Sequence, residues 1–213
     1  MNEPHRFTGN EIELSNGQPF DVDTPDRESI DLYTIASSLS NLCRFGGHVQ
    51  FYSVAEHAVL VATKLRLIGA PVSMQLAGLH HDDHEALDGF GDIQRPAKPL
   101  MDSPEYRARC ARIDLAIWQS IAWRDRTDAL WDLNDLHSEL LKRVDIWAVL
   151  FEAHHLMHSG GHGWEQTVDR ELAVVPIPNH DEDRIECYLP WTARNAYLEK
   201  HNELVDFSGA VRA

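Results

Sequence analysis

The chain has 213 residues, of which 43% are hydrophobic and 25% are charged, a composition that is typical of one globular domain over residues 1–213 and excludes a disordered or collagen-like chain. Its formal charge of −15 would repel the phosphate backbone of DNA or RNA, so no nucleic-acid partner is expected. It has no apolar run as long as a membrane span and no secretory-signal pattern, so we expect a cytoplasmic protein with no membrane partner.

The first part of the chain predicts a β-hairpin and then a helix. Residues 11–22 alternate apolar and polar side chains around Asn16 and Gly17, a pair that favours a tight hairpin turn. Residues 29–42 place apolar side chains at mostly helical spacing, and two glycines follow. A first helix is therefore expected to end near Leu42.

Two further helices are predicted in the next part of the chain. Ser53 followed three positions later by Glu56 is a capping-box pattern, which predicts a second helix over residues 53–69. Residues 72–87 continue as a third helix, which we expect to stop before Gly89.

The remaining helices complete a mainly α-helical bundle with a short N-terminal β-hairpin. A fourth helix is expected to start at Pro104. A long helical pattern follows over residues 125–158, with an interruption around Asn134, and a final helix is expected over about 190–206. The helical core of the domain is expected over about 30–158.

The stretch from Gly78 to Asp92, GLHHDDHEALDGFGD, gathers three histidines and five acidic residues. If His81 and Asp82 bind one cation, other helices must supply further ligands, because neighbouring helix positions point about 100° apart. His57 and Asp145 are polar residues within otherwise apolar stretches, where burial is costly unless a partner compensates. We therefore expect a single cation site whose ligands are His57, His81, Asp82 and Asp145.

The donor types restrict the metal and suggest its chemistry. Imidazole and carboxylate ligands suit Co, Mn, Zn, Fe or Ni, and Mg also remains open. Such a cation would lower the pKa of a bound water toward about 7 and polarise a phosphoryl or carbonyl oxygen. Glu85 lies three residues after Asp82, on nearly the same face of the predicted helix, and could orient that water or accept its proton. Asp92, just past the glycine turn, could act similarly or hold a substrate hydroxyl.

Simpler interpretations of these residues stay open. His57 could be a hydrogen-bonded core histidine, and Asp145 could form an ion pair with a neighbouring base such as Arg143. Glu85 could be a solvated carboxylate at a helix end, and Arg44 an exposed surface charge.

Two other histidine pairs could compete for a metal. His80 with His84, and His154 with His158, each lie one helical turn apart. The three cysteines lie far apart and lack a zinc-binding spacing, so we expect reduced, inert thiols.

The order His, His-Asp, Asp resembles that of the HD-domain superfamily of metal-dependent phosphohydrolases. The resemblance is closest to a branch of small bacterial 5'-deoxynucleotidases and phage deoxynucleoside triphosphate hydrolases. It covers roughly residues 30–150 through three stretches of the sequence, CRFGGHVQFYSVAEHAVLVA, LHHDDHEALDGFGDIQRPAK and LLKRVDIWAVL. It implies an HD-type fold, with the metal at the four expected ligands.

The resemblance also implies roles for five further residues. Glu85 and Asp92 match the catalytic carboxylates of the family pattern, although the loop between them is slightly longer here. Arg44 and Phe45 match an Arg-aromatic pair that contacts the nucleotide, and Phe45 stands where the deoxynucleotidases usually carry tryptophan. Lys98 matches a lysine that could bind phosphate, whereas residues 159–183 match no part of the pattern.

We therefore expect a divalent-metal-dependent phosphohydrolase whose partner is a small deoxynucleotide substrate. We favour a 5'-deoxynucleotidase that releases phosphate from a monophosphate, because few cations are available for a triphosphate tail. One alternative is a hydrolase that releases triphosphate from a deoxynucleoside triphosphate such as dATP. An alternative of another class is a non-catalytic nucleotide or metal sensor, which would not require Glu85 and Asp92. The sequence leaves open the base, the native metal and whether the chain forms a homo-oligomer.

Overall fold

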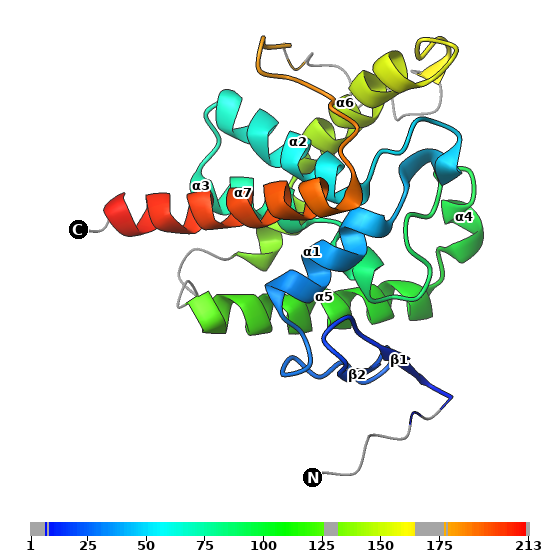
Figure 1. The fold of residues 1–213 in the computed structure, drawn as a ribbon, viewed down its shortest axis with the longest axis vertical. Helices are drawn as coiled ribbons and strands as arrows, with labels where there is room; N and C mark the ends of the chain where they lie inside the picture. The colour runs from blue at the N-terminus through cyan, green and yellow to red at the C-terminus, as the bar shows by residue number, and fades with distance from the viewer. Residues whose placement is uncertain (1–6, 8, 126–131, 165–176, 178, 212–213) are drawn as a thin grey trace.

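The structure of the chain is a computed structural model, which describes residues 7, 9–125, 132–164, 177 and 179–211. It is mainly α-helical, with a two-stranded sheet near the N-terminus (Figure 1). The predicted fold class, a helical bundle with a short β-hairpin, is therefore confirmed. Parts of the expected helix over 125–158 and of the unmatched stretch 159–183 lie outside the described residues.

The predicted hairpin is present. Strands β1 (Glu11–Glu13) and β2 (Pro19–Asp21) are antiparallel, with Ile12 opposite Phe20. Gly17 has a φ of +79° in the connecting turn, a backbone conformation that glycine adopts without strain. The Phe20 side chain is buried in the main hydrophobic cluster, so it anchors the hairpin to the helices.

The first two helices begin at side-chain caps. Helix α1 (Leu32–Asn41) begins after Asp31, whose carboxylate accepts a hydrogen bond from a backbone N–H of the first turn. Helix α2 (Val54–Leu67) begins after Ser53, whose hydroxyl oxygen accepts from the backbone N–H of Glu56. Both predicted helices are confirmed, since a polar side chain at this position satisfies one of the free N–H groups of a helix start.

The predicted third helix over 72–87 is too long. Helix α3 (Val72–His80) ends earlier, and a short 3-10 helix, η2 (Asp83–Ala86), follows it. Between them Asp82 has φ −106° and ψ 13°, outside the helical region. Successive acidic side chains oppose the negative end of a helix dipole, and aspartate competes for nearby backbone groups, which accounts for the early end.

The next helices follow a turn. Helix α4 (Lys98–Met101) is short, and helix α5 (Pro104–Asp125) starts at the predicted proline. The expected interruption near Asn134 is confirmed, because a 3-10 helix, η4 (Leu133–His137), lies there.

The predicted start of the long helix over 125–158 is wrong. Helix α6 (Glu139–Leu156) begins only after Ser138, whose hydroxyl accepts a hydrogen bond from the backbone N–H of Leu141. The periodic pattern did not show this cap.

Packing around α2 and α3 fixes the positions of the elements. Helix α7 (Pro190–Val211), longer than the predicted 190–206, crosses α1, α2 and α3 (Figure 1). One buried cluster joins the hairpin to α1, α2, α3, α5 and α7, and another fills the space between α2, α3 and α6. Because α2 and α3 contribute to both clusters, side chains on them are held by packing on two sides. In the described part of the chain, no helix combines the length and the apolarity needed to cross a membrane.

Candidate metal centre

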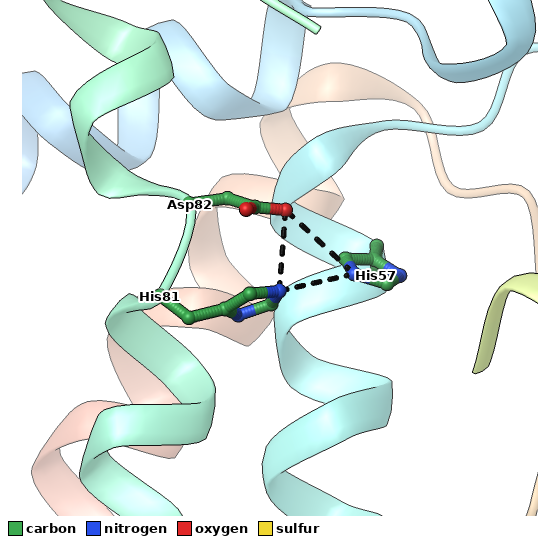
Figure 2. A group of neighbouring side chains, drawn as sticks. All are labelled: His57, His81 and Asp82. Atoms are coloured by element: carbon green, nitrogen blue, oxygen red, sulfur yellow. Dashed lines mark hydrogen bonds and ion pairs between the residues drawn. The ribbon is translucent and has the colours of Figure 1, made fainter. Parts of the chain in front are cut away.

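The four expected metal ligands meet between three helices. His57 comes from the first half of α2, His81 and Asp82 follow the end of α3, and Asp145 comes from α6. Figure 2 shows the His57 and His81 rings and the Asp82 carboxylate turned toward one another. Donor atoms of these three residues all lie within 4.8 Å of one another. Asp145 Oδ1 lies 3.2 Å from His57 Nε2 and 3.8 Å from His81 Nε2.

The early end of α3 allows two adjacent residues to face one point. His81 Nε2 and Asp82 Oδ2 lie 3.2 Å apart, although neighbouring positions of a continuous helix would point about 100° apart. The non-helical backbone of Asp82 turns its carboxylate back toward the imidazole. The deviation from the predicted helix therefore helps to assemble the site.

Both imidazoles are oriented by their second nitrogen. His57 Nδ1 lies 2.5 Å from Glu152 Oε1, and His81 Nδ1 lies 2.9 Å from the carbonyl oxygen of Gly78. Metal-binding histidines commonly donate this N–H to a carboxylate or a carbonyl. The two Nε2 atoms lie 3.3 Å apart, and in neutral imidazoles with the proton at Nδ1 both lone pairs would be available to one ion between them. A cation there would replace the second protons of the imidazoles, so the residues present fit a metal ion.

Glu152 is a residue of this site that the sequence analysis missed. Its side chain is fully buried on α6. It accepts hydrogen bonds from Arg44 Nε at 3.2 Å and from the Tyr52 hydroxyl at 3.1 Å, besides its contact with His57. It lies seven residues, about two helical turns, after Asp145 and thus on the same helix face. An acidic residue at that spacing in an apolar stretch was the available signal.

The charges of the site favour a cation. Burial opposes ionisation of Asp82, but the His81 and His57 imidazoles outweigh it and lower the pKa of Asp82 to about 2. Burial also opposes ionisation of Asp145, yet hydrogen bonds from the same imidazoles hold its pKa well below the ordinary value. Burial and the charge of Arg44 lower the pKa of His57, but Glu152 and Asp145 together outweigh them and raise it to about 9. Both aspartates are therefore ionised at neutral pH, and positive charge between them is stabilised.

A cavity of about 630 Å³ adjoins the metal ligands. Asp82 and Asp145 form part of its wall, and four predicted site residues share that wall: Arg44, Phe45, Asp92 and Lys98. The other lining residues, which the sequence analysis did not single out as site residues, are Ile93, Gln94, Arg95, Pro96, Val149 and Trp164. The cavity thus combines carboxylates, cations and aromatic rings beside one candidate metal position.

Arg44 and Phe45 begin the 3-10 helix η1 (Arg44–Gly47). Arg44 is buried, so its interpretation as a surface charge is wrong. Its Nη1 lies 3.8 Å from Asp82 Oδ2, while its Nε donates to Glu152. Phe45 has a φ of +56°, which is strained for a residue with a side chain. Its ring packs edge-to-face on Trp164, with the centroids 5.6 Å apart.

Glu85 is buried on η2, so it is not a solvated carboxylate at a helix end. Its Oε2 has no hydrogen-bond partner among the described residues. Burial, followed by the negative charges of Asp82 and Asp92, raises the pKa of Glu85 well above its ordinary value. The structure therefore brings Glu85 into the electrostatic field of the other predicted site residues, although it lies outside the cavity lining.

The two competing histidine pairs do not assemble. His80 is buried against Asp83 and His201, whereas His84 pairs with Asp114. Within the described parts of the chain, no group of three metal-binding side chains contains both members of either pair.

Comparison with known proteins finds a similar protein, whose activity is not characterized. No family model matches the chain. An uncharacterized protein of Escherichia coli (strain K12), YfdR, is 29% identical over 194 residues, which cover 91% of this chain and 94% of that protein. The similarity therefore extends over nearly the whole length of both chains.

Proposed function

We propose that the chain is a divalent-metal-dependent phosphohydrolase of the HD-domain superfamily and acts as a 5'-deoxynucleotidase on deoxynucleoside monophosphates. The observation that carries this proposal is the direct junction between the donor cluster and the cavity, since Asp82 belongs to both and Asp145, 3.2 Å from His57 Nε2, also lines the cavity. A ligand in the cavity can therefore present an oxygen to a cation held at the cluster.

The chain's own residues can bind and orient such a substrate. When bound, a divalent cation would supply a water of lowered pKa and would polarise a phosphoryl oxygen. Arg44, fixed by Glu152, and Lys98 place positive charge on the cavity wall for phosphate oxygens. Burial and two neighbouring carboxylates raise the pKa of Glu85, which favours its protonated form and suits it to exchange a proton with a water or a leaving oxygen. Asp92, on the cavity wall, can accept a hydrogen bond from the substrate.

The cavity also supports the size and charge of the proposed substrate. Its volume of about 630 Å³ lies within the range of about 300–1,000 Å³ that is common for small-ligand sites. Phe45 and Trp164 offer aromatic surface to a base. Its three cations are Arg44, Arg95 and Lys98, and the first of them already faces two carboxylates. This balance favours one phosphate over a triphosphate tail.

The test is a substrate panel with the purified chain and Mn²⁺ or Co²⁺. We expect phosphate release from deoxynucleoside monophosphates. His81→Ala should lower kcat/KM by about 100-fold or more, because losing a ligand should cost at least as much as losing a partner of a ligand, about 10–100-fold. The matched control is His155→Ala, which changes an exposed histidine of α6.

Three results would contradict the proposal in different ways. Triphosphate release from deoxynucleoside triphosphates, with monophosphates untouched, would replace the nucleotidase by a triphosphohydrolase. No product from any substrate would favour a non-catalytic sensor. Activity that survives His81→Ala would move the reaction to another site.

A further inference from the structure

Four metal-binding side chains that the proposed reaction does not use lie between η2 and α5. His84 belongs to η2 and Asp88 follows it, whereas Cys110 and Asp114 lie one helical turn apart on α5. Donor atoms of His84, Asp88 and Cys110 all lie within 4.8 Å of one another. Asp114 Oδ1 approaches His84 Nδ1 to 3.3 Å. Two separate segments thus bring an imidazole, a carboxylate and a thiol within reach of one ion, and the Asp114 carboxylate lies beside the imidazole.

The 3.3 Å contact between His84 Nδ1 and the Asp114 carboxylate is an ion pair rather than a well-aligned hydrogen bond. His84 Nδ1 is buried and has no hydrogen-bond partner among the described residues, although the Asp114 oxygen is near. A buried polar nitrogen without a hydrogen bond is costly. A cation between the two atoms would satisfy both, just as one between His57 and His81 would relieve their close contact.

Hydrogen bonds hold the Asp88 carboxylate in place and leave one of its lone-pair positions free for a metal. Its side chain is buried, and Oδ1 accepts from the backbone N–H groups of Phe90 and Gly91. Its Oδ2 accepts from the Tyr106 hydroxyl at 2.9 Å. An ionised carboxylate offers about four lone-pair positions, and these bonds use three of them. Metal-binding carboxylates are commonly fixed by such hydrogen bonds.

We propose that His84, Asp88, Cys110 and Asp114 form a second metal site that binds Zn²⁺ or a similar first-row cation such as Co²⁺. Mixed nitrogen, oxygen and thiolate donors suit these ions, and four protein ligands are typical of a structural zinc site. Cys110 loses its thiol proton to solvent when it binds, and His84 binds as the neutral imidazole. The ion fastens the turn before Asp92 to α5.

The test uses cobalt, because Co²⁺ bound to a thiolate absorbs in the near ultraviolet by charge transfer from sulfur. The candidate metal centre has no sulfur ligand among the described residues, so the band distinguishes thiolate-bound Co²⁺ from Co²⁺ at that centre. Reduced, metal-free chain titrated with CoCl₂ without oxygen should develop the band. His81→Ala should keep it, which makes the result independent of the proposed hydrolysis.

Variants separate Cys110 from the other thiols. Cys110→Ser should lose the band and bind one Co²⁺ fewer per chain. The matched control Cys187→Ser should keep the band and bind as many Co²⁺ ions as the wild type. Asp114→Asn should weaken the Co²⁺ affinity that the band measures by about 10-fold or more. Circular dichroism would check that each variant is folded. If Cys110→Ser does not fold, the band of the wild type and the affinity of Asp114→Asn test the site instead. No band in the saturated wild type, or a band that survives in folded Cys110→Ser, would overturn the proposal.

Discussion

Glu152 connects a metal ligand to a cavity cation through one buried carboxylate. One oxygen lies 2.5 Å from His57 Nδ1, and the other accepts from Arg44 Nε. The orientation of the imidazole and the position of the guanidinium therefore depend on the same side chain. Glu152 is best described as a positioning residue, since its contacts are to His57, Arg44 and Tyr52.

Glu152→Gln should weaken metal binding while the chain stays folded. The change keeps the shape of the side chain but removes the charge that fixes His57, and changes in such partners typically cost about 10–100-fold in affinity. Titration of the metal-free chain with Mn²⁺ would measure the loss. The control is Glu139→Gln, at the exposed start of the same helix. Equal Mn²⁺ affinity in both variants would show that Glu152 does not orient a ligand.

Site residues could be predicted where a polar residue stands within an apolar stretch that the fold is expected to bury. His57 and Asp145 stood out as polar side chains in apolar helical stretches, and the structure brings both to His81. Glu152 had the same signal, but without a motif it looked like an ordinary helix carboxylate. Trp164 had no signal, because it comes from a stretch without periodicity or motif and reaches the cavity only through tertiary packing.

Helix α1 depends on a charged cap whose strength should vary with pH. Asp31 accepts hydrogen bonds from the Thr34 backbone N–H and from Asn16 Nδ2. Burial opposes ionisation, but these donors prevail and lower the pKa of Asp31 below its ordinary value of 3.8. A folded-state pKa below the unfolded value gives stability that is present above the unfolded pKa and lost as the pH falls through the folded one.

Asp31→Ala should therefore lower the free energy of unfolding by about 1 kcal/mol at neutral pH. The difference from the wild type should shrink below pH 3.8, as the carboxyl group of the wild type becomes protonated. Asp31→Asn is the control, because its oxygen accepts the same hydrogen bond without titrating. Denaturant melts at several pH values would measure this difference in unfolding free energy. A difference that stays constant down to low pH would show that the charge of Asp31 does not strengthen the cap.

Helix α7 is anchored by a buried hydroxyl. The Tyr197 hydroxyl donates to Asp83 Oδ1 at 2.5 Å and lies 2.8 Å from His80 Nδ1. Tyr197→Phe would leave these buried groups without that partner, so we expect a loss of about 1–3 kcal/mol in unfolding free energy. Tyr33→Phe is the matched control, because it removes an exposed hydroxyl that also contacts α7, through a hydrogen bond from Arg194, and so measures what a surface contact contributes. Equal melting temperatures in the two variants would show that the hydroxyl does not anchor α7.

Elements with local signals were predicted well. The starts of α1 and α2 followed from periodicity and capping residues, and the start of α5 followed from Pro104. The early end of α3 was missed, because apolar periodicity continued to Leu87 while the acidic side chains that end the helix resembled a polar face. The start of α6 was missed because Ser138 acts through a cap that periodicity does not register.

At the scale of the whole molecule, metal binding should stabilise the fold. The expected ligands come from α2, the end of α3 and α6, which unfolding would separate. A metal at about 100 times its dissociation constant should add about 2.7 kcal/mol, which corresponds to a rise of about 5–10 °C in Tm for a chain of this size. Differential scanning calorimetry with and without Mn²⁺ would measure it. Asp145→Asn should reduce this rise, and an unchanged rise would place the stabilising ion elsewhere.

The arrangement of the helices could not be derived from the sequence. Periodicity identified a mainly α-helical chain with one hairpin, but it does not determine which helices cross. The packing of α7 over α1, α2 and α3 depends on buried contacts between residues far apart in the chain.

The most direct test of the account is a crystal structure of the chain with Mn²⁺, with anomalous scattering used to locate the metal. We predict a peak within bonding distance, about 2.0–2.3 Å, of His57 Nε2, His81 Nε2 and one oxygen each of Asp82 and Asp145. A fully loaded crystal with no peak between these atoms, or with the ion bound by other residues instead, would contradict the account.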